Sequence, residues 1–170
     1  MMIQTEAVMK FQCPLFAVKD IAVCKEFYSG LLGQKLKYDF GENIVFEGDF
    51  SFQQKEHFAQ MISVELSSVL TQSHNAELYF ETDDFDVLTQ KLADRHGIDF
   101  LHPIRLHDWG QRTIRFYDPD RHIIEVGENM DIVIARFLKE GKTPEQVAQI
   151  TQHPIQKVES VFLEINDQRE

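Results

Sequence analysis

The chain has little of what would place it outside the cell or in a membrane. It contains only 2 cysteines in 170 residues, too few for the disulfide framework of a small secreted protein. No hydrophobic run approaches the roughly 20 residues of a transmembrane helix, and residues 1–6 lack the basic start and apolar block of a secretory signal. These absences predict a cytoplasmic protein without a membrane span, in which Cys13 and Cys24 are reduced thiols.

Positive charge is also scarce. The 17 Lys and Arg residues face 28 Asp and Glu residues, which gives a formal net charge of -11. Binding to nucleic acid depends on cations that replace counterions at phosphates. The composition therefore disfavours nucleic acids and anionic membrane surfaces as partners. An acidic surface favours cationic small molecules, although in most cytosolic proteins it serves only solubility.

The composition does contain what a packed core requires. Hydrophobic residues make up 43% of the chain and aromatic residues 11%, with 14 Phe among them, which argues against disorder. A chain of this length can bury one sizeable core but is short for two independent domains. We therefore expect one folded unit, which could contain two small modules.

Residues 11–54 follow the order strand, helix, strand, strand, strand. Alternating residues 11–18 lead to Asp20, whose carboxylate can cap a helix that ends near Gly33. Three strand-like stretches follow, separated by glycine-containing turns, around residues 34–40, 43–47 and 50–53.

Residues 76–127 repeat this order. An alternating stretch precedes a helix that Asp83 or Asp84 can cap, and a hairpin follows across Asp118-Pro119-Asp120. Two tandem βαβββ modules are an internal repeat. They predict an α+β fold whose mixed sheet curves into a cup. Between the modules, Met61–Leu66 is predicted to be an additional strand.

Alternation along the strands sorts their side chains onto two faces, because strand residues two apart share a face. The first face is apolar and should pack on the helices: Phe16, Val18, Phe50, Phe52, Leu78, Phe80, Ile114, Phe116, Ile124 and Val126. The second face is of mixed polarity: Cys13, Leu15, Ala17, Ser51, Gln53, Glu77, Tyr79, Glu81, Ile123 and Glu125. Such a face on a curved sheet predicts the lining of a ligand cavity.

Glu125 and Glu77 are the candidate catalytic residues. An acid in a β-branched strand is costly to bury unless it is paired, bound to a metal or facing a wet cavity. Two carboxylates on one cavity face would repel each other, so one should hold a proton, and such a pair can act as general acid and base. The alternative is a structural ion pair or a solvated position at a sheet edge.

Other side chains near this face are candidate substrate contacts. Tyr79 is a candidate contact or proton donor on the second face. His107, Trp109 and Arg112 lie in or beside the loop that enters the second hairpin, where a ring and a cation could hold a planar or anionic group. Alternatively, Trp109 fills a gap beside the sheet. The other histidines show no ligand-like spacing and are expected in loops or on the surface: His57, His74, His96, His102, His122 and His153.

Each of the two modules contains short motifs of its own. They are Val18-Lys19-Asp20, Phe27-Tyr28, Leu31-Leu32-Gly33, Trp109-Gly110-Gln111-Arg112, Phe116-Tyr117-Asp118-Pro119-Asp120 and Ile124-Glu125. Their order and spacing over residues 11–128 resemble the vicinal oxygen chelate superfamily. That superfamily includes glyoxalase I, bleomycin resistance proteins, extradiol dioxygenases and methylmalonyl-CoA epimerase.

The resemblance implies a divalent metal held by Cys13, Gln53, Glu77 and Glu125. Glu125 matches the family's residue type and Gln53 is found in the epimerase branch, whereas Cys13 and Glu77 depart from it, since both positions are more often His. The set could still hold Zn, Ni, Mn or Fe. Alternatively, Cys13 is a small buried hydrophobe, and a register shift of one residue would exchange Gln53 with Gln54.

Residues 131–170 lie outside the resemblance and are predicted to form a three-helix extension to a domain at residues 1–130. Thr143-Pro144-Glu145-Gln146 is a capping box with Pro at the first helical position. Three short helices can imitate a helix-turn-helix, but the segment has five Lys and Arg against seven Asp and Glu. We therefore expect a cap on the sheet or a homodimer contact rather than DNA binding.

Three functions follow from the cavity and the resemblance. The first is a glyoxalase-like lyase or isomerase that acts next to a substrate carbonyl, with a divalent metal as Lewis acid if one binds. The second is a metal-free binding protein of the bleomycin-resistance kind. The third is a ligand-sensing regulator. The fold does not choose among them.

Overall fold

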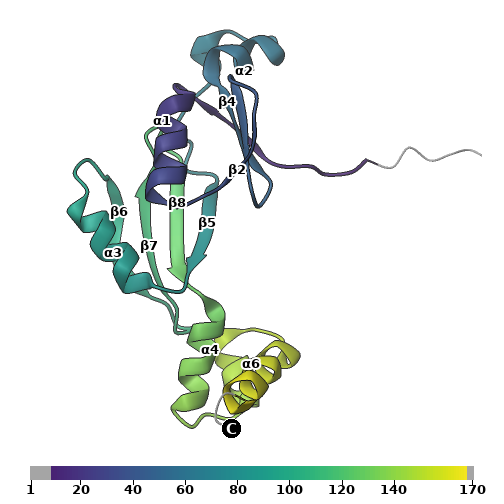
Figure 1. The fold of residues 1–170 in the computed structure, drawn as a ribbon, viewed down its shortest axis with the longest axis vertical. Coiled ribbons are helices and arrows are strands. Elements are labelled where there is room, and N and C mark those ends of the chain that lie inside the picture. The colour runs from purple at the N-terminus through teal and green to yellow at the C-terminus, as the bar shows by residue number, and fades with distance from the viewer. Residues whose placement is uncertain (1–8, 168–170) are drawn as a thin grey trace, which may run out of the picture. The chain divides into compact units, whose positions relative to one another are not determined.

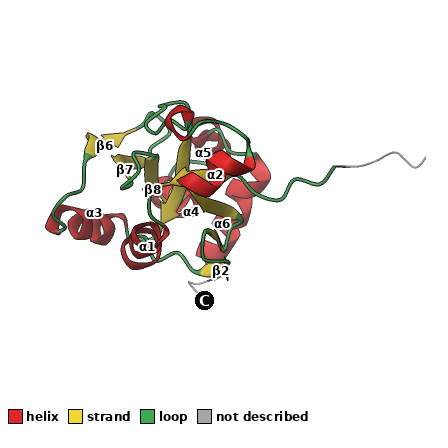
Figure 2. Ribbon diagram, turned by 90° about the horizontal axis from the view of Figure 1, so that it is seen from above, coloured by secondary structure: helices red, strands yellow, loops and turns green. Residues whose placement is uncertain are grey.

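The computed structural model describes residues 9–167 (Figure 1). The chain divides into two compact units, with the boundary between Thr71 and Gln72. Each unit combines a mixed four-stranded sheet with helices, so the α+β class is confirmed (Figure 2). Within residues 9–167, no helix combines the length and apolar character needed to span a bilayer.

The first unit contains the first βαβββ module. Its sheet has the order β1-β4-β3-β2, in which β1 and β4 are parallel and the other pairs are antiparallel. The elements of the module are β1 (Leu15–Val18), α1 (Ile21–Lys25), η1 (Glu26–Leu31), β2 (Leu36–Asp39), β3 (Asn43–Phe46) and β4 (Phe50–Gln54). They are followed by α2 (Lys55–Met61) and the short η2 (Leu66–Ser68).

The second unit contains the second module, with the equivalent order β5-β8-β7-β6. Its elements are β5 (Glu77–Thr82), α3 (Phe85–Asp94), β6 (Phe100–Leu106), β7 (Arg112–Tyr117) and β8 (Ile123–Glu128). Three further helices complete the unit: α4 (Met130–Lys139), α5 (Pro144–Thr151) and α6 (Ile155–Asp167). The tandem βαβββ repeat predicted from the sequence is confirmed.

Local sequence signals explain where several helices begin. Asp20 Oδ1 accepts hydrogen bonds from the backbone N–H groups of Ala22 (2.7 Å) and Val23 (3.1 Å), which satisfies donors at the start of α1. At α5, Thr143 and Gln146 form the predicted capping box. Asp84 precedes α3 without a capping bond from its side chain.

The predicted strand at Met61–Leu66 is wrong. Residues 55–61 form α2, and a turn with Ser63 at φ 58° follows. Alternation over six residues does not distinguish a strand from a helix end followed by a turn. Strand β6 had no individual prediction, because its exposed residues do not alternate in polarity.

Helices α4, α5 and α6 pack around a small apolar core of their own. Ile134, Val147, Val158 and Val161 are buried in it, with Phe137, Leu138 and Ile165 among the half-buried neighbours. Polar contacts at one end join the core to the sheet. Arg136 reaches Glu128 Oε1 at 3.0 Å and the carbonyl oxygen of Gly110 at 2.5 Å. The three helices therefore stand directly after β8 in a fixed position within the second unit.

Gly110 should tolerate no side chain, because α4 approaches it closely. Its φ is +86°, and an added Cβ would lie 2.3 Å from Phe137 Cζ. We expect Gly110→Ala to lower the free energy of unfolding by about 2–4 kcal/mol, from a left-handed backbone and overpacking. Gly141→Ala is the matched control, since its φ is +90° but nothing lies within 4 Å. If urea denaturation shows that both variants lose the same free energy of unfolding, packing against Phe137 does not contribute to the effect at Gly110.

Candidate functional site

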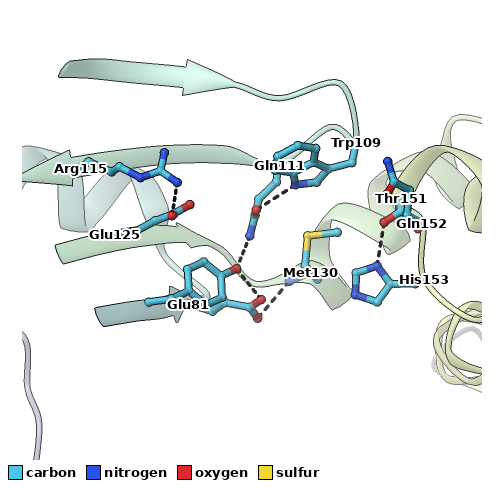
Figure 3. A pocket seen from close by; sticks show the side chains of 10 residues that line it. Glu81, Trp109, Gln111, Arg115, Glu125, Met130, Thr151, Gln152 and His153 are labelled. Carbon is cyan, nitrogen blue, oxygen red and sulfur yellow. Dashed lines mark hydrogen bonds and ion pairs between the residues drawn. The ribbon is translucent and has the colours of Figure 1, made fainter. Parts of the chain in front are cut away.

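A cavity of about 530 Å³ opens on the second face of the second sheet (Figure 3). Strands β5, β7 and β8, the loop before β7, the start of α4 and the turn between α5 and α6 all contribute to it. Its lining residues are Tyr79, Glu81, Trp109, Gln111, Arg115, Glu125, Met130, Thr151, Gln152 and His153. All of them belong to the second unit.

An arginine joins Glu125, which lines the cavity, to Glu77, which is not among the lining residues. Arg115 Nε donates to Glu77 Oε2 at 2.9 Å, and its Nη2 donates to Glu125 Oε2. The strand register creates this arrangement, because Glu125 lies opposite Arg115 on β7 and opposite Tyr79 on β5. Glu125 is only 5% exposed. The carboxylate is thus held by its strand, by a cation and by the cavity wall.

The two acids differ in proton affinity. Burial, reinforced by the hydrogen bond with the Glu77 carboxyl group, raises the pKa of Glu125 to about 7, although Arg115 opposes this rise. The hydrogen bond from Arg115 lowers the pKa of Glu77 below its usual value. Near neutral pH, Glu77 is ionised while Glu125 exchanges between its two forms. A carboxyl group in that condition can both take and return a proton.

A chain of hydrogen bonds fixes the neighbouring wall (Figure 3). Trp109 Nε1 donates to Gln111 Oε1 (3.0 Å), and Gln111 Nε2 donates to the Tyr79 hydroxyl (2.7 Å). That hydroxyl donates to Glu81 Oε1 (2.8 Å), and Glu81 Oε2 accepts from the Met130 N–H (3.3 Å). Burial raises the pKa of Tyr79 to about 12. The phenol therefore stays protonated, and the wall is preorganised for a ligand.

Trp109 presents a ring to the cavity because His107 supports it from behind. The two rings stack with centroids 4.1 Å apart and an interplanar angle of 10°. His107 Nε2 also lies 2.9 Å from Thr113 Oγ1, and burial lowers the pKa of His107. His107 therefore acts on Trp109 rather than lining the cavity itself.

Arg112, a predicted substrate contact, is placed away from the cavity lining. It forms ion pairs with Asp86 (2.7 Å) and Glu128 (2.9 Å). Alternation explains this placement, since Arg112 shares a face of β7 with Ile114, whereas Arg115 shares the cavity face with Thr113.

The remaining predicted metal ligands, Cys13 and Gln53, belong to the first unit. Cys13 Sγ lies 3.4 Å from Ser51 Oγ and is a free thiol. Gln53 Nε2 donates to the carbonyl oxygen of Glu42 (2.7 Å) and lies 3.0 Å from His57 Nδ1. The register pairs Gln53, not Gln54, with Ala17 on the predicted second face.

The side chains as arranged do not fit a metal ion. Arg115 binds one carboxylate oxygen of Glu77 and one of Glu125, so a second cation there would meet a guanidinium charge. Among residues 9–167, no three His, Cys, Asp or Glu side chains gather in a group able to hold a metal.

Several lining residues escaped the prediction from sequence. Arg115 could have been found, because alternation from Ile114 and Phe116 places it on the face of Glu125. Gln111 lies in a loop, whose side-chain directions have no period. Thr151, Gln152 and His153 come from the far end of the chain, and His153 lies in a loop as expected but also lines the cavity, which was not predicted.

Comparisons with known proteins identify the family. The family model of the glyoxalase-like domain matches residues 11–131 of this chain. The chain therefore belongs to the glyoxalase-like domain family. A solved protein of unknown function from Agrobacterium tumefaciens is 36% identical, with a TM-score of 0.63, and the match covers 74% of this chain and 98% of that one. No similar protein was found among curated proteins.

More distant solved structures share the fold. A glyoxalase/bleomycin resistance protein/dioxygenase from Nocardioides is 19% identical, has a TM-score of 0.56, and matches over 73% of this chain and 86% of its own. The fosfomycin resistance protein FosX from Mesorhizobium loti is 20% identical, has a TM-score of 0.50, and matches over 72% and 94%. The predicted family resemblance is confirmed by the family model over residues 11–131, and these structures share its fold.

Proposed function

We propose that the second-unit cavity binds a small carbonyl compound and that Glu125 moves a proton at the carbon next to the carbonyl. The observation that carries this proposal is a buried carboxyl group, with a pKa of about 7, in the wall of a cavity. Perturbed acids in clefts are characteristic of general acid–base catalysis. The reaction class is that of an isomerase or a lyase.

The step balances with the residues present. The ionised Glu125 takes the proton, and the electrons of the C–H bond move to the carbonyl oxygen as an enolate forms. Arg115, already aligned with Glu125, supports the developing negative charge. In an α-hydroxy carbonyl substrate, the hydroxyl proton then shifts to the enolate oxygen and Glu125 returns its proton to the former carbonyl carbon, which gives an isomer. Loss of a leaving group from the adjacent carbon gives a lyase product instead.

Exchange with heavy water tests this proposal without knowledge of the natural substrate. The protein is incubated in D2O with a panel of small ketones, aldehydes and keto acids, and loss of the α-proton signal is followed by NMR. We expect at least one compound to exchange faster than with buffer alone. The rate should increase with pH about a midpoint near 7, because the base is the ionised form of Glu125. A rate without that dependence would refute the role of Glu125.

The implied divalent metal is tested separately. Glu77 and Glu125 are engaged by Arg115, so we expect neither to hold Zn, Ni, Mn or Fe in this arrangement. Untagged protein is reconstituted with each metal, dialysed and analysed for metal content, and the analysis is repeated on Glu125→Ala. Stoichiometric metal that disappears in the variant would show that Arg115 moves aside for a cation.

A second candidate is a binding protein for a cationic compound. The cavity has an aromatic ring, Trp109, and the acid Glu81 in its wall, a combination that attracts cations, whereas the charge of Glu125 is already paired with Arg115. The net charge of -11 acts in the same direction. Calorimetric titration with bleomycin at low salt examines this candidate. Tight binding without α-proton exchange of any compound would favour it over catalysis.

A further inference from the structure

The cavity has a wall outside the family domain. Thr151, Gln152 and His153 line it from the end of α5 and the turn that follows (Figure 3), whereas the family model ends at residue 131. The Agrobacterium relative is matched over 98% of its length by only 74% of this chain. This turn is thus a part of the site that the family's shared domain does not supply.

The turn is held in one conformation by its surroundings. Thr151 is buried, and its hydroxyl donates to the carbonyl oxygen of Val147 at 2.8 Å. Gln152 ends α5 with a φ of 58°, a left-handed conformation that is uncommon for a residue with a side chain. Lys157 on α6 donates to Asp131 on α4 at 2.7 Å. The turn is therefore ordered before a ligand binds, so binding loses little conformational entropy there.

His153 has a defined hydrogen-bonding capacity. Its Nδ1 lies 3.0 Å from the backbone carbonyl oxygen of Thr151, and a carbonyl can only accept, so Nδ1 carries the hydrogen. In the neutral ring, Nε2 is then an acceptor. Among the residues that the structure describes, none bonds to Nε2. The ring side chain that lines the cavity therefore offers a fixed acceptor.

The polar groups on the sheet side of the wall are already engaged. Gln111 uses both amide hydrogens, one on the Tyr79 hydroxyl and one on the Glu128 carbonyl oxygen at 2.8 Å. The Tyr79 hydroxyl hydrogen goes to Glu81. Glu125 is joined to Arg115. At the helical end a ligand meets the exposed Gln152 side chain and His153, and of these two His153 has its acceptor fixed by a hydrogen bond within the protein.

We propose that His153 is a specificity residue, which accepts a hydrogen bond from a hydroxyl or amine group on the substrate's end away from the carbonyl. The proposal rests on the carbonyl binding proposed for Glu125 and Arg115. It defines the substrate as a bifunctional compound, with a carbonyl near Glu125 and Arg115 on the sheet and a hydrogen-bond donor near His153 at the C-terminal helices. The C-terminal helices thereby select the substrate.

Paired probes test the proposal directly. They are methyl ketones of increasing chain length with a terminal hydroxyl, each compared with its methyl ether, which cannot donate. Binding is measured by NMR titration of wild type, His153→Phe and the exposed matched control His96→Phe. We expect one hydroxy ketone to bind about fivefold tighter than its ether, and the preference to vanish only in His153→Phe. In wild type, the 15N signal of His153 Nε2 should move with the hydroxy ketone only.

The outcomes separate this proposal from the proposed reaction. If no compound exchanges its α-proton but the binding preference still depends on His153, the proposed reaction is overturned. The role of His153 as a specificity residue then stands. Exchange with equal binding of alcohol and ether would overturn the specificity residue alone. Failure of every hydroxy ketone to bind, or an unchanged Nε2 signal on binding, would also overturn it.

Discussion

Glu125→Gln should lose about 10²- to 10⁴-fold of the α-proton exchange rate, the usual contribution of a positioned general base. Glutamine keeps the volume of the side chain and an oxygen that can accept from Arg115, so the cavity wall should persist. It has no basic oxygen that could take a proton at neutral pH. The measurement is the initial exchange rate in D2O at pH 8, where Glu125 of the wild type is largely ionised.

The matched control is Glu159→Gln, which removes one negative charge from the exposed face of α6. This variant should exchange at the wild-type rate. If Glu125→Gln kept more than about a tenth of the rate while remaining folded, Glu125 would not be the base, since such a loss is smaller than general base catalysis provides. Binding of a ketone to Glu125→Gln should change little.

Stability supplies an independent check on the same carboxyl group. Its pKa is about 7 in the folded protein against an ordinary value of 4.5. A raised folded pKa gives stability that is fully present below the unfolded pKa, and it is lost as the pH rises through the folded one. The difference in unfolding free energy between wild type and Glu125→Gln should therefore favour wild type more at pH 4.5 than at pH 8. Urea denaturation at the two pH values measures the difference.

Alternation along the strands was the most informative sequence signal for the site. It placed Tyr79 and Glu125 on one face, and the register pairs them across β5 and β8. The same period applied to β7 would have added Arg115, the partner that decides how Glu125 titrates. The period is informative because a sheet buries one face, and a shift of one residue would expose every apolar side chain.

Where backbone periodicity ends, the sequence predicted less. The loop that carries Trp109 and Gln111 has its conformation set by tertiary hydrogen bonds, so the role of Gln111 could not be deduced from its neighbours. His153 is 28 residues beyond Glu125 in the chain. Its place in the cavity depends on how α4 leaves β8 and on the packing of three helices, which no local pattern specifies.

Glu128→Ala should destabilise the second unit by about 2–3 kcal/mol. Glu128 is 4% exposed and binds Arg112 (2.9 Å) and Arg136 (3.0 Å). Burial alone would raise its pKa, but hydrogen bonds from these two arginines outweigh burial and lower the pKa to about 2. Removing one partner of a buried ion pair typically costs about 3–5 kcal/mol. The arginines are about one third exposed and recover part of that in water.

The measurement is thermal unfolding at pH 7, where a loss of this size corresponds to about 4–12 °C. Glu140→Ala, which removes an exposed acid paired with Lys142, is the control and should change the midpoint little. The difference between wild type and Glu128→Ala should shrink as the pH falls from the ordinary value of 4.5 through about 2, because a depressed pKa gives stability that acid removes. A difference independent of pH would show that packing, not the ion pair, holds α4.

The same variant connects stability to the site. Arg136 on α4 reaches both Glu128 and the Gly110 carbonyl oxygen, and α4 carries the helices that present His153. Without the carboxylate, α4 loses its charged attachment to β8, and the helical wall should become mobile relative to the sheet. We therefore expect Glu128→Ala to weaken the preference for hydroxy ketones over ethers. Exchange at Glu125, which depends on strands β7 and β8, should fall less. If the binding preference and the exchange rate fall to the same extent, the loss of Glu128 affects the sheet and the helices together.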